Sequence, residues 1–187
     1  MLYGVDTYGP RFLFKGVKVE QLYEQLKTAL LAEIEATPSD RLPRDTDEEE
    51  GFVAGRVPRL PELGEVRYVG TEKGEGRDVF GGRAMVDFNV YEVAFHGGAP
   101  ALFDCNPRSH ANMPWGVTPH GEVMERCLRF KAQTNQDPDR QVEDFKREVQ
   151  GQLDKLRPDM VHLDTELRRG VLDAIRRARS RAPRSKY

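Results

Sequence analysis

The stretch Gly82–Trp115, GRAMVDFNVYEVAFHGGAPALFDCNPRSHANMPW, decides the fold class of this 187-residue chain. Apolar residues alternate with polar ones from Met85 to Phe95, and the run His96–Pro100 that follows is rich in glycine. This pattern is typical of an antiparallel strand that ends in a tight turn. Because no complete catalytic or cofactor motif follows the turn, the stretch predicts an architecture rather than a chemical activity.

The residues on either side of this stretch extend the prediction to an α+β domain with a mainly antiparallel sheet. From Val19 to Ile34, apolar residues recur at three- and four-residue steps, which predicts a helix over 19–35 that packs on the sheet. The predicted strands lie near 3–14, 66–69, 84–95, 101–104 and 122–130.

The final third of the chain predicts two helices. Asp137-Pro138 is a typical helix start, because aspartate caps a helix and proline suits its first turn. An apolar stripe then runs to Arg157-Pro158, where proline is expected to end the first helix, and a second stripe follows. We therefore expect a sheet domain over 1–136, a helical hairpin over 137–180 that packs on it, and a basic tail over 181–187.

Residues 37–64 contain four prolines around the acidic run Asp45–Glu50. Neighbouring carboxylates repel one another and usually stay solvated. A metal site or a mimic of nucleic-acid phosphate is the alternative, but a hard cation needs spaced oxygen ligands rather than a packed block of carboxylates. The run is therefore predicted to be a plain surface loop.

Composition restricts the classes of function. The formal net charge is −2 and 32% of the residues are charged, which indicates no overall attraction to nucleic acid or to a membrane. No apolar run approaches the roughly 18–20 residues that span a bilayer, and the first residues lack the order of a signal peptide. Two cysteines are too few for a disulfide scaffold. These features predict a cytoplasmic location.

Three side chains suggest a less favoured hypothesis of catalysis. His96, Cys105 and His110 lie in one segment, so folding could bring a thiol and an imidazole together. Zinc ligands usually occur as closely spaced pairs, and the three residues do not follow that spacing. A small metal- or cysteine-dependent hydrolase is thus the weakest hypothesis, and we expect no cofactor and no metal.

The segment that follows the turn is polar, is limited by prolines and ends at the only tryptophan. Such a loop can recognise a ligand or a protein through hydrogen bonds framed by an aromatic anchor. The alternative is a simple crossover in which the tryptophan packs on the sheet edge. The candidate binding residues are His96, Asn106, Arg108, His110, Asn112 and Trp115.

The C-terminal segment from Arg168 to Lys186 carries eight cationic side chains and one carboxylate, Asp173. Arginines neutralise phosphates and release their counterions, although cations also suit the C-terminus of a helix. The alternative function is therefore nucleic-acid binding through Arg168, Arg169, Arg176, Arg177, Arg179 and Arg181.

The order of elements from Arg77 to Ala182 resembles an N-terminal module of large bacterial proteins. The segments concerned are YEVAFHGGAPALFDCNPRSHANMPWG (91–116), PDRQVEDFKREVQGQLDKL (138–156) and LRRGVLDAIRRARSRA (167–182). Members of that family continue into a restriction-endonuclease-like or other effector domain. The turn His96-Gly97-Gly98 departs from the more acidic turn of the family, and the first 65 residues match none of it.

The resemblance implies a non-catalytic sensor or adaptor in a bacterial defence-type system. Residues 96–115 would recognise a ligand or protein, and the helical hairpin would dock or transmit. The expected partner is a protein or a separate effector, nucleic acid is the alternative partner, no membrane is expected, and homo-oligomerisation stays open.

Overall fold

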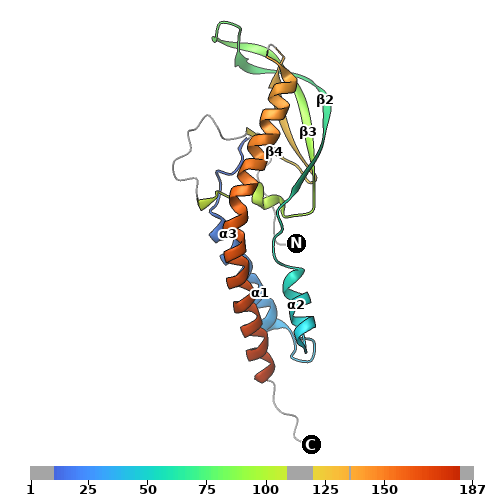
Figure 1. Ribbon diagram of the computed structural model, residues 1–187, viewed down its shortest axis with the longest axis vertical. Coiled ribbons are helices and arrows are strands. Elements are labelled where there is room, and N and C mark those ends of the chain that lie inside the picture. Colours follow the sequence, from blue (N-terminus) through green and yellow to red (C-terminus); the bar gives the residue numbers. More distant parts are fainter. Residues whose placement is uncertain (1–10, 109–119, 135, 182–187) are drawn as a thin grey trace, which may run out of the picture.

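The computed structural model describes residues 11–108, 120–134 and 136–181. It shows an α+β fold with a four-strand antiparallel sheet, N-terminal helices and a long C-terminal helix, α3 (Pro138–Ser180), that packs on helix α1 (Val19–Ala36). The sheet lies beside the first half of α3, whereas α1 and α2 (Thr46–Ala54) lie beside its second half (Figure 1). The α+β class and the antiparallel sheet are therefore confirmed.

Four strands make up the main sheet, and β1 extends it by two residues beyond β4. The order is β1-β4-β5-β3-β2, and every pairing is antiparallel. Strand β2 is thus at one edge, and among the described residues its only partner is β3. The bounds are β1 Arg11–Phe12, β2 Glu62–Arg77, β3 Arg83–His96, β4 His120–Val123 and β5 Cys127–Gln133.

Strand β2 is much longer than the predicted strand 66–69. The prediction is too short because glycines, which suggest loops, lie inside the strand. Cross-strand side chains cover two of them: a Cβ atom added at Gly74 would lie 3.2 Å from the ring of Phe88, and one added at Gly76 would clash with Val86 and lie 3.1 Å from Phe88. An aromatic neighbour thereby occupies the space that a glycine leaves empty in a strand.

The predicted strand 101–104 is wrong. These residues belong mainly to a 3₁₀ helix, η1 (Pro100–Phe103). Gly97 and Gly98 before it have positive φ angles of 59° and 66°, which turn the chain away from the extended direction of β3. The short helix then buries its apolar side chains in the core instead of adding a strand.

The predicted strand 122–130 is two strands, β4 and β5, because the chain reverses between them. The N–H of Met124 donates to the carbonyl of Cys127 at 2.8 Å and closes this turn. The predicted first strand, 3–14, is confirmed only at β1, and residues 3–10 lie outside the described part of the chain.

Helix α1 confirms the helix predicted over 19–35. It buries the expected stripe and ends at Ala36, where the extended C-cap residue Thr37 precedes Pro38. The backbone N–H of Lys18 donates to Oε1 of Gln21 at 3.0 Å, which satisfies one free donor at the start of the helix.

The prediction of a surface loop at the acidic run is wrong, because the run forms the start of helix α2. The carboxylate of Asp45 accepts the backbone N–H of Glu48 at 2.9 Å and caps the helix. Three further acidic residues lie in the first turn, where the positive end of the helix dipole stabilises negative charge.

The predicted helical hairpin over 137–180 is also wrong, because α3 is a single helix of 43 residues with Pro158 inside it. The predicted start is confirmed, since the carboxylate of Asp137 accepts the N–H of Arg140 at 3.2 Å. Pro158 itself is exposed, and the buried stripe continues across it without a change of phase. Burial along the same face, at Leu156, Met160 and Leu163, outweighs the hydrogen bond that the proline removes.

One core joins the two halves of the molecule along α3. Against the sheet, Phe145 of α3 stacks on Phe130 at 4.1 Å between ring centroids, and Phe130 stacks on Tyr91 at 5.7 Å. Further along α3, the buried residues Leu163, Leu167, Val171 and Ile175 belong to the same core as the α1 stripe.

Candidate functional site

The predicted recognition residues do not form one cluster. His96 ends β3 and lines a hollow with Glu125 and Arg126, whereas Asn106 and Arg108 line a different cavity of about 240 Å³ beside the start of α1. The other three candidates, His110, Asn112 and Trp115, lie outside the described residues.

Arg108 ties the segment after η1 to both long helices. Its guanidinium donates to the carboxylate of Glu20 in α1, and its backbone N–H donates to Oδ2 of Asp159 in α3 at 3.0 Å. Burial alone would raise the pKa of Glu20, but the hydrogen bond and charge of Arg108 outweigh it and hold that pKa below its ordinary value. Arg108 is thus engaged in an internal contact.

Two oxygen atoms in that cavity have no donor. Oε2 of Glu20 and Oδ1 of Asn106 are both buried, and within the described residues neither accepts a hydrogen bond. Buried acceptors usually find a donor. The cavity could therefore take a water molecule or another small donor.

Cys105 is poorly suited to nucleophilic catalysis. Its side chain is fully buried, and its thiol donates a hydrogen bond to the carbonyl oxygen of Ala101 at 3.4 Å. Burial, with the nearby charge of Asp104, raises its pKa to about 12, so the reactive thiolate is rare near neutral pH. Within the described ranges, no three His, Cys, Asp or Glu side chains are grouped so that they could hold a metal ion.

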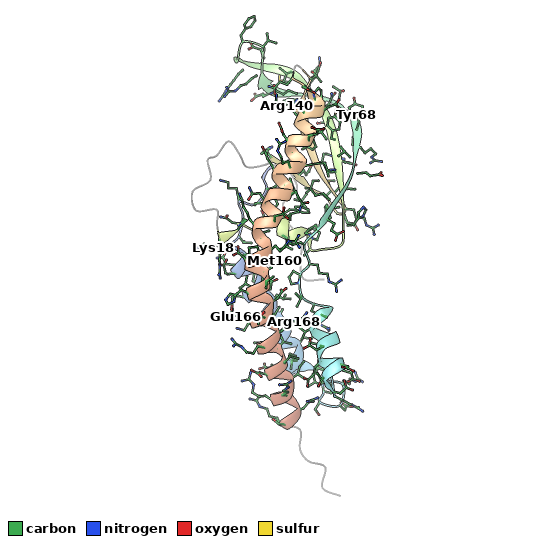
Figure 2. The ribbon with its side chains drawn as sticks, in the orientation of Figure 1. Lys18, Tyr68, Arg140, Met160, Glu166 and Arg168 are labelled. Carbon is green, nitrogen blue, oxygen red and sulfur yellow. The ribbon has the colours of Figure 1, made fainter. Side chains whose placement is uncertain are left out.

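The acidic run and the arginines of α3, which lie far apart in the sequence, meet in space. Arg176 and Arg179 both contact the carboxylate of Glu49, at 3.2 and 3.0 Å, and only 4% of that side chain is exposed. Arg168 contacts Glu50 at 2.8 Å, and Figure 2 shows it on α3 at the level of α2. Three of the six candidate arginines are therefore paired internally.

The other three candidate arginines, Arg169, Arg177 and Arg181, are exposed. No ion pair involves them in the part of the chain that the structure describes. They retain their charge for an external anion, but they number only half of the predicted set.

The β2–β3 hairpin carries a surface that the sequence predictions missed. Five exposed apolar side chains lie on it, namely Tyr68 (53% exposed), Val69 (45%), Val79 (76%), Phe80 (93%) and Met85 (66%). Figure 2 shows Tyr68 on β2 at the border of the sheet. The alternation of polar and apolar residues in β3 could have suggested part of this surface. The glycines of β2 suggest loops, so the sequence does not predict the rest of it.

The turn that presents Val79 and Phe80 has a defined shape. The carboxylate of Asp78 accepts the backbone N–H groups of Phe80 at 2.9 Å and Gly82 at 2.8 Å. The N–H of Asp78 in turn donates to the carbonyl of Gly82 at 2.9 Å. These hydrogen bonds within the turn fix its backbone, and the turn exposes the side chains of Val79 and Phe80.

The open face of the sheet is mainly ionic. A hollow of about 480 Å³ there includes Arg129 and Lys131, which pair at 2.7 and 2.6 Å with Glu92 and Glu72. Hydrogen bonds from Arg129 and Arg67 hold the pKa of Glu92 below its ordinary value. These charges already satisfy one another, so the hollow is a weaker candidate than the hairpin.

None of the helices in the described residues is long and apolar enough to cross a membrane. No protein-family model matches the chain, and no curated protein or solved structure matches it either. The resemblance to the bacterial accessory module therefore remains a prediction.

Proposed function

We propose that this chain is a non-catalytic protein-binding module and that the β2–β3 hairpin is its contact surface. One observation carries the proposal: of the seven exposed large apolar side chains in the described residues, five lie on this hairpin. Single exposed apolar residues are common on soluble proteins, but five on one projecting element favour a contact surface there.

The chemistry of the remaining candidates supports a binding role over a catalytic one. The Cys105 thiol is buried and its pKa is raised, and Arg108 is engaged by Glu20. A nucleophile needs an accessible thiolate and a base within hydrogen-bond reach. These side chains are better explained as parts of the folded scaffold, since Cys105 lies in the core and Arg108 contacts α1 and α3.

The proposal includes a sensor or adaptor role in a bacterial defence-type system, with an effector protein as a partner and the cytoplasm as the location. The resemblance and the composition support these points. The binding role itself rests on the hairpin and stands without them.

Nucleic-acid binding is a second candidate, because Arg169, Arg177 and Arg181 are exposed on one end of α3. Replacing the three with glutamine tests it by fluorescence anisotropy with a labelled DNA oligonucleotide. Binding that falls steeply with salt in the native chain and disappears in the variant supports this function. Equal anisotropy of both proteins excludes it.

Site-specific photo-crosslinking in the cells that express the chain tests the protein-binding function. A photo-crosslinking amino acid replaces Met85 beside the tip, and a second protein carries it at the exposed Glu143 of α3 as the control. We expect a discrete adduct from position 85 only, and its loss when Val79→Ser and Phe80→Ser are added. No adduct from position 85, or equal adducts from both positions, contradicts the proposal.

A further inference from the structure

The outer part of the β2–β3 hairpin is a ribbon of two strands. Strand β5 pairs with β3 only as far as Phe88, which lies opposite Gln133 on one side and Glu72 on the other. Residues 73–87, here called the arm, therefore continue beyond the third strand (Figure 1). A two-stranded ribbon is marginal in water. Its edge on β2, where no second strand of the described residues pairs, is a template for another strand.

Side chains along this edge are arranged symmetrically about Gly74. Lys73 and Glu75 flank it with opposite charges, and both are exposed. Five and six residues before Gly74 lie Val69 and Tyr68, and five and six residues after it lie Val79 and Phe80. Lys73 and Glu75 belong to β2, and Val79 and Phe80 to the turn that follows it. A segment with this pattern is complementary to a second copy of itself in antiparallel orientation.

The backbone of β2 has the same symmetry. The Asp78 N–H donates to the Gly82 carbonyl, so residues 78 and 82 are a hydrogen-bonded pair. The register from Gly70 to Arg77 has no shift, and hydrogen-bonded and non-bonded pairs alternate in an antiparallel ladder. The backbone groups of Lys73 and Glu75 therefore point away from β3, toward the free edge.

We propose that β2 pairs with β2 of a second copy of this chain, antiparallel and about a two-fold axis at Gly74. Lys73 of each copy then lies opposite Glu75 of the second copy, and their outward backbone groups exchange hydrogen bonds. The tip of each arm, Val79 and Phe80, lies against Tyr68 and Val69 of the second copy. The two arms together form a four-stranded ribbon.

This inference deepens the proposed function, because it names a second copy as the partner of the hairpin. The bulge between Tyr68 and Gly70 supports the location of the axis, since it limits regular pairing to the arm side of Val69. Pairing of two identical edges also closes the assembly and leaves β2 no edge for further growth.

Charge reversal tests the pairing. The mass of the full chain is measured by light scattering over a concentration series, where the native protein is expected at twice 21.3 kDa. Lys73→Glu or Glu75→Lys alone places like charges opposite each other and is expected to weaken dimerisation by about tenfold or more. The double variant restores opposite charges, and an equimolar mixture of the two single variants is expected to form heterodimers.

Glu143→Lys on α3 is the control and is expected to leave the dimer intact, and the melting temperature of each variant verifies folding. A dimer insensitive to both single reversals overturns the inference, because another surface then forms it. A chain that stays monomeric while position 85 crosslinks to a different protein also overturns it, and leaves the proposed binding function standing.

Discussion

At the helical end of the molecule, formed by α1, α2 and residues 160–180 of α3, most large apolar side chains are buried, and Glu49 and Glu50 are paired with arginines of α3. The arm at the other end exposes Val79, Phe80 and Met85. Both ends contain dense charge in the sequence. The two ends differ in what covers their surfaces. At the helical end, elements of the same chain pack against one another, whereas in our account the arm packs against a second copy of the chain.

The largest expected effect is a difference in the free energy of unfolding between a variant at the helical end and a variant in the arm. Leu167→Ala removes a side chain of α3 that is only 2% exposed and lies at the helical end, and should lower the free energy of unfolding by about 2–5 kcal/mol. Phe80→Ala removes a larger side chain that is 93% exposed, and should change the stability of the monomer by less than about 0.5 kcal/mol. Urea unfolding of both variants at low protein concentration measures the contrast. Equal losses would mean that Phe80 packs within its own chain.

The continuity of α3 gives the next effect. Pro158→Ala restores a backbone donor and removes a ring from an exposed helical position, and should stabilise the protein by about 1–3 kcal/mol. Thermal unfolding checks this against Arg157→Ala as a control. A loss of stability in the proline variant would instead indicate that the fold needs the interruption of helical hydrogen bonding at Pro158.

The contact between α2 and α3 should contribute less. Glu49→Gln removes the buried charge that Arg176 and Arg179 share, and we expect a loss of about 1–2 kcal/mol, since both arginines are partly exposed. Glu50→Gln, at a side chain that is 52% exposed, is the matched control with a smaller expected loss. Urea unfolding that gives the two variants the same midpoint would refute the special role of Glu49.

The Glu20–Arg108 pair should give the smallest effect, visible in its pH dependence. Because the folded-state pKa of Glu20 is lowered, the ionised carboxylate stabilises the fold above its unfolded-state pKa, and this stabilisation is lost as pH falls through the folded-state pKa. Arg108→Ala should lower the melting temperature by about 1–3 °C at neutral pH. The difference between variant and native protein should shrink in acid, and a difference that grows there would contradict this sign.

Local signals predicted parts of the fold well. The α1 stripe, the end before Pro38 and the Asp137 cap depend on neighbouring residues alone, and the structure confirms them. Pro158 was misleading because proline is a strong local signal, whereas the uninterrupted burial of Leu156, Met160 and Leu163 comes from packing on distant elements.

The functional surfaces were harder to predict because their partners lie far apart in the sequence. The acidic run alone suggests a loop, whereas in the structure Asp45 caps α2. The contact between Glu49 and Arg176 joins residues 127 positions apart. Gly74 and Gly76 suggest loops because the side chains that cover them, chiefly Phe88 and Val86, belong to another strand. The arm was therefore not predicted.

Hydrogen exchange of the purified full chain, compared at low and high protein concentration, tests the central claim most directly. Our account predicts that the amides of Lys73 and Glu75 exchange more slowly as concentration rises, while amides of α1 and of α3 around Val171 exchange at unchanged rates. Exchange at Lys73 and Glu75 that is independent of concentration over the same range would show that a second copy does not cover this edge.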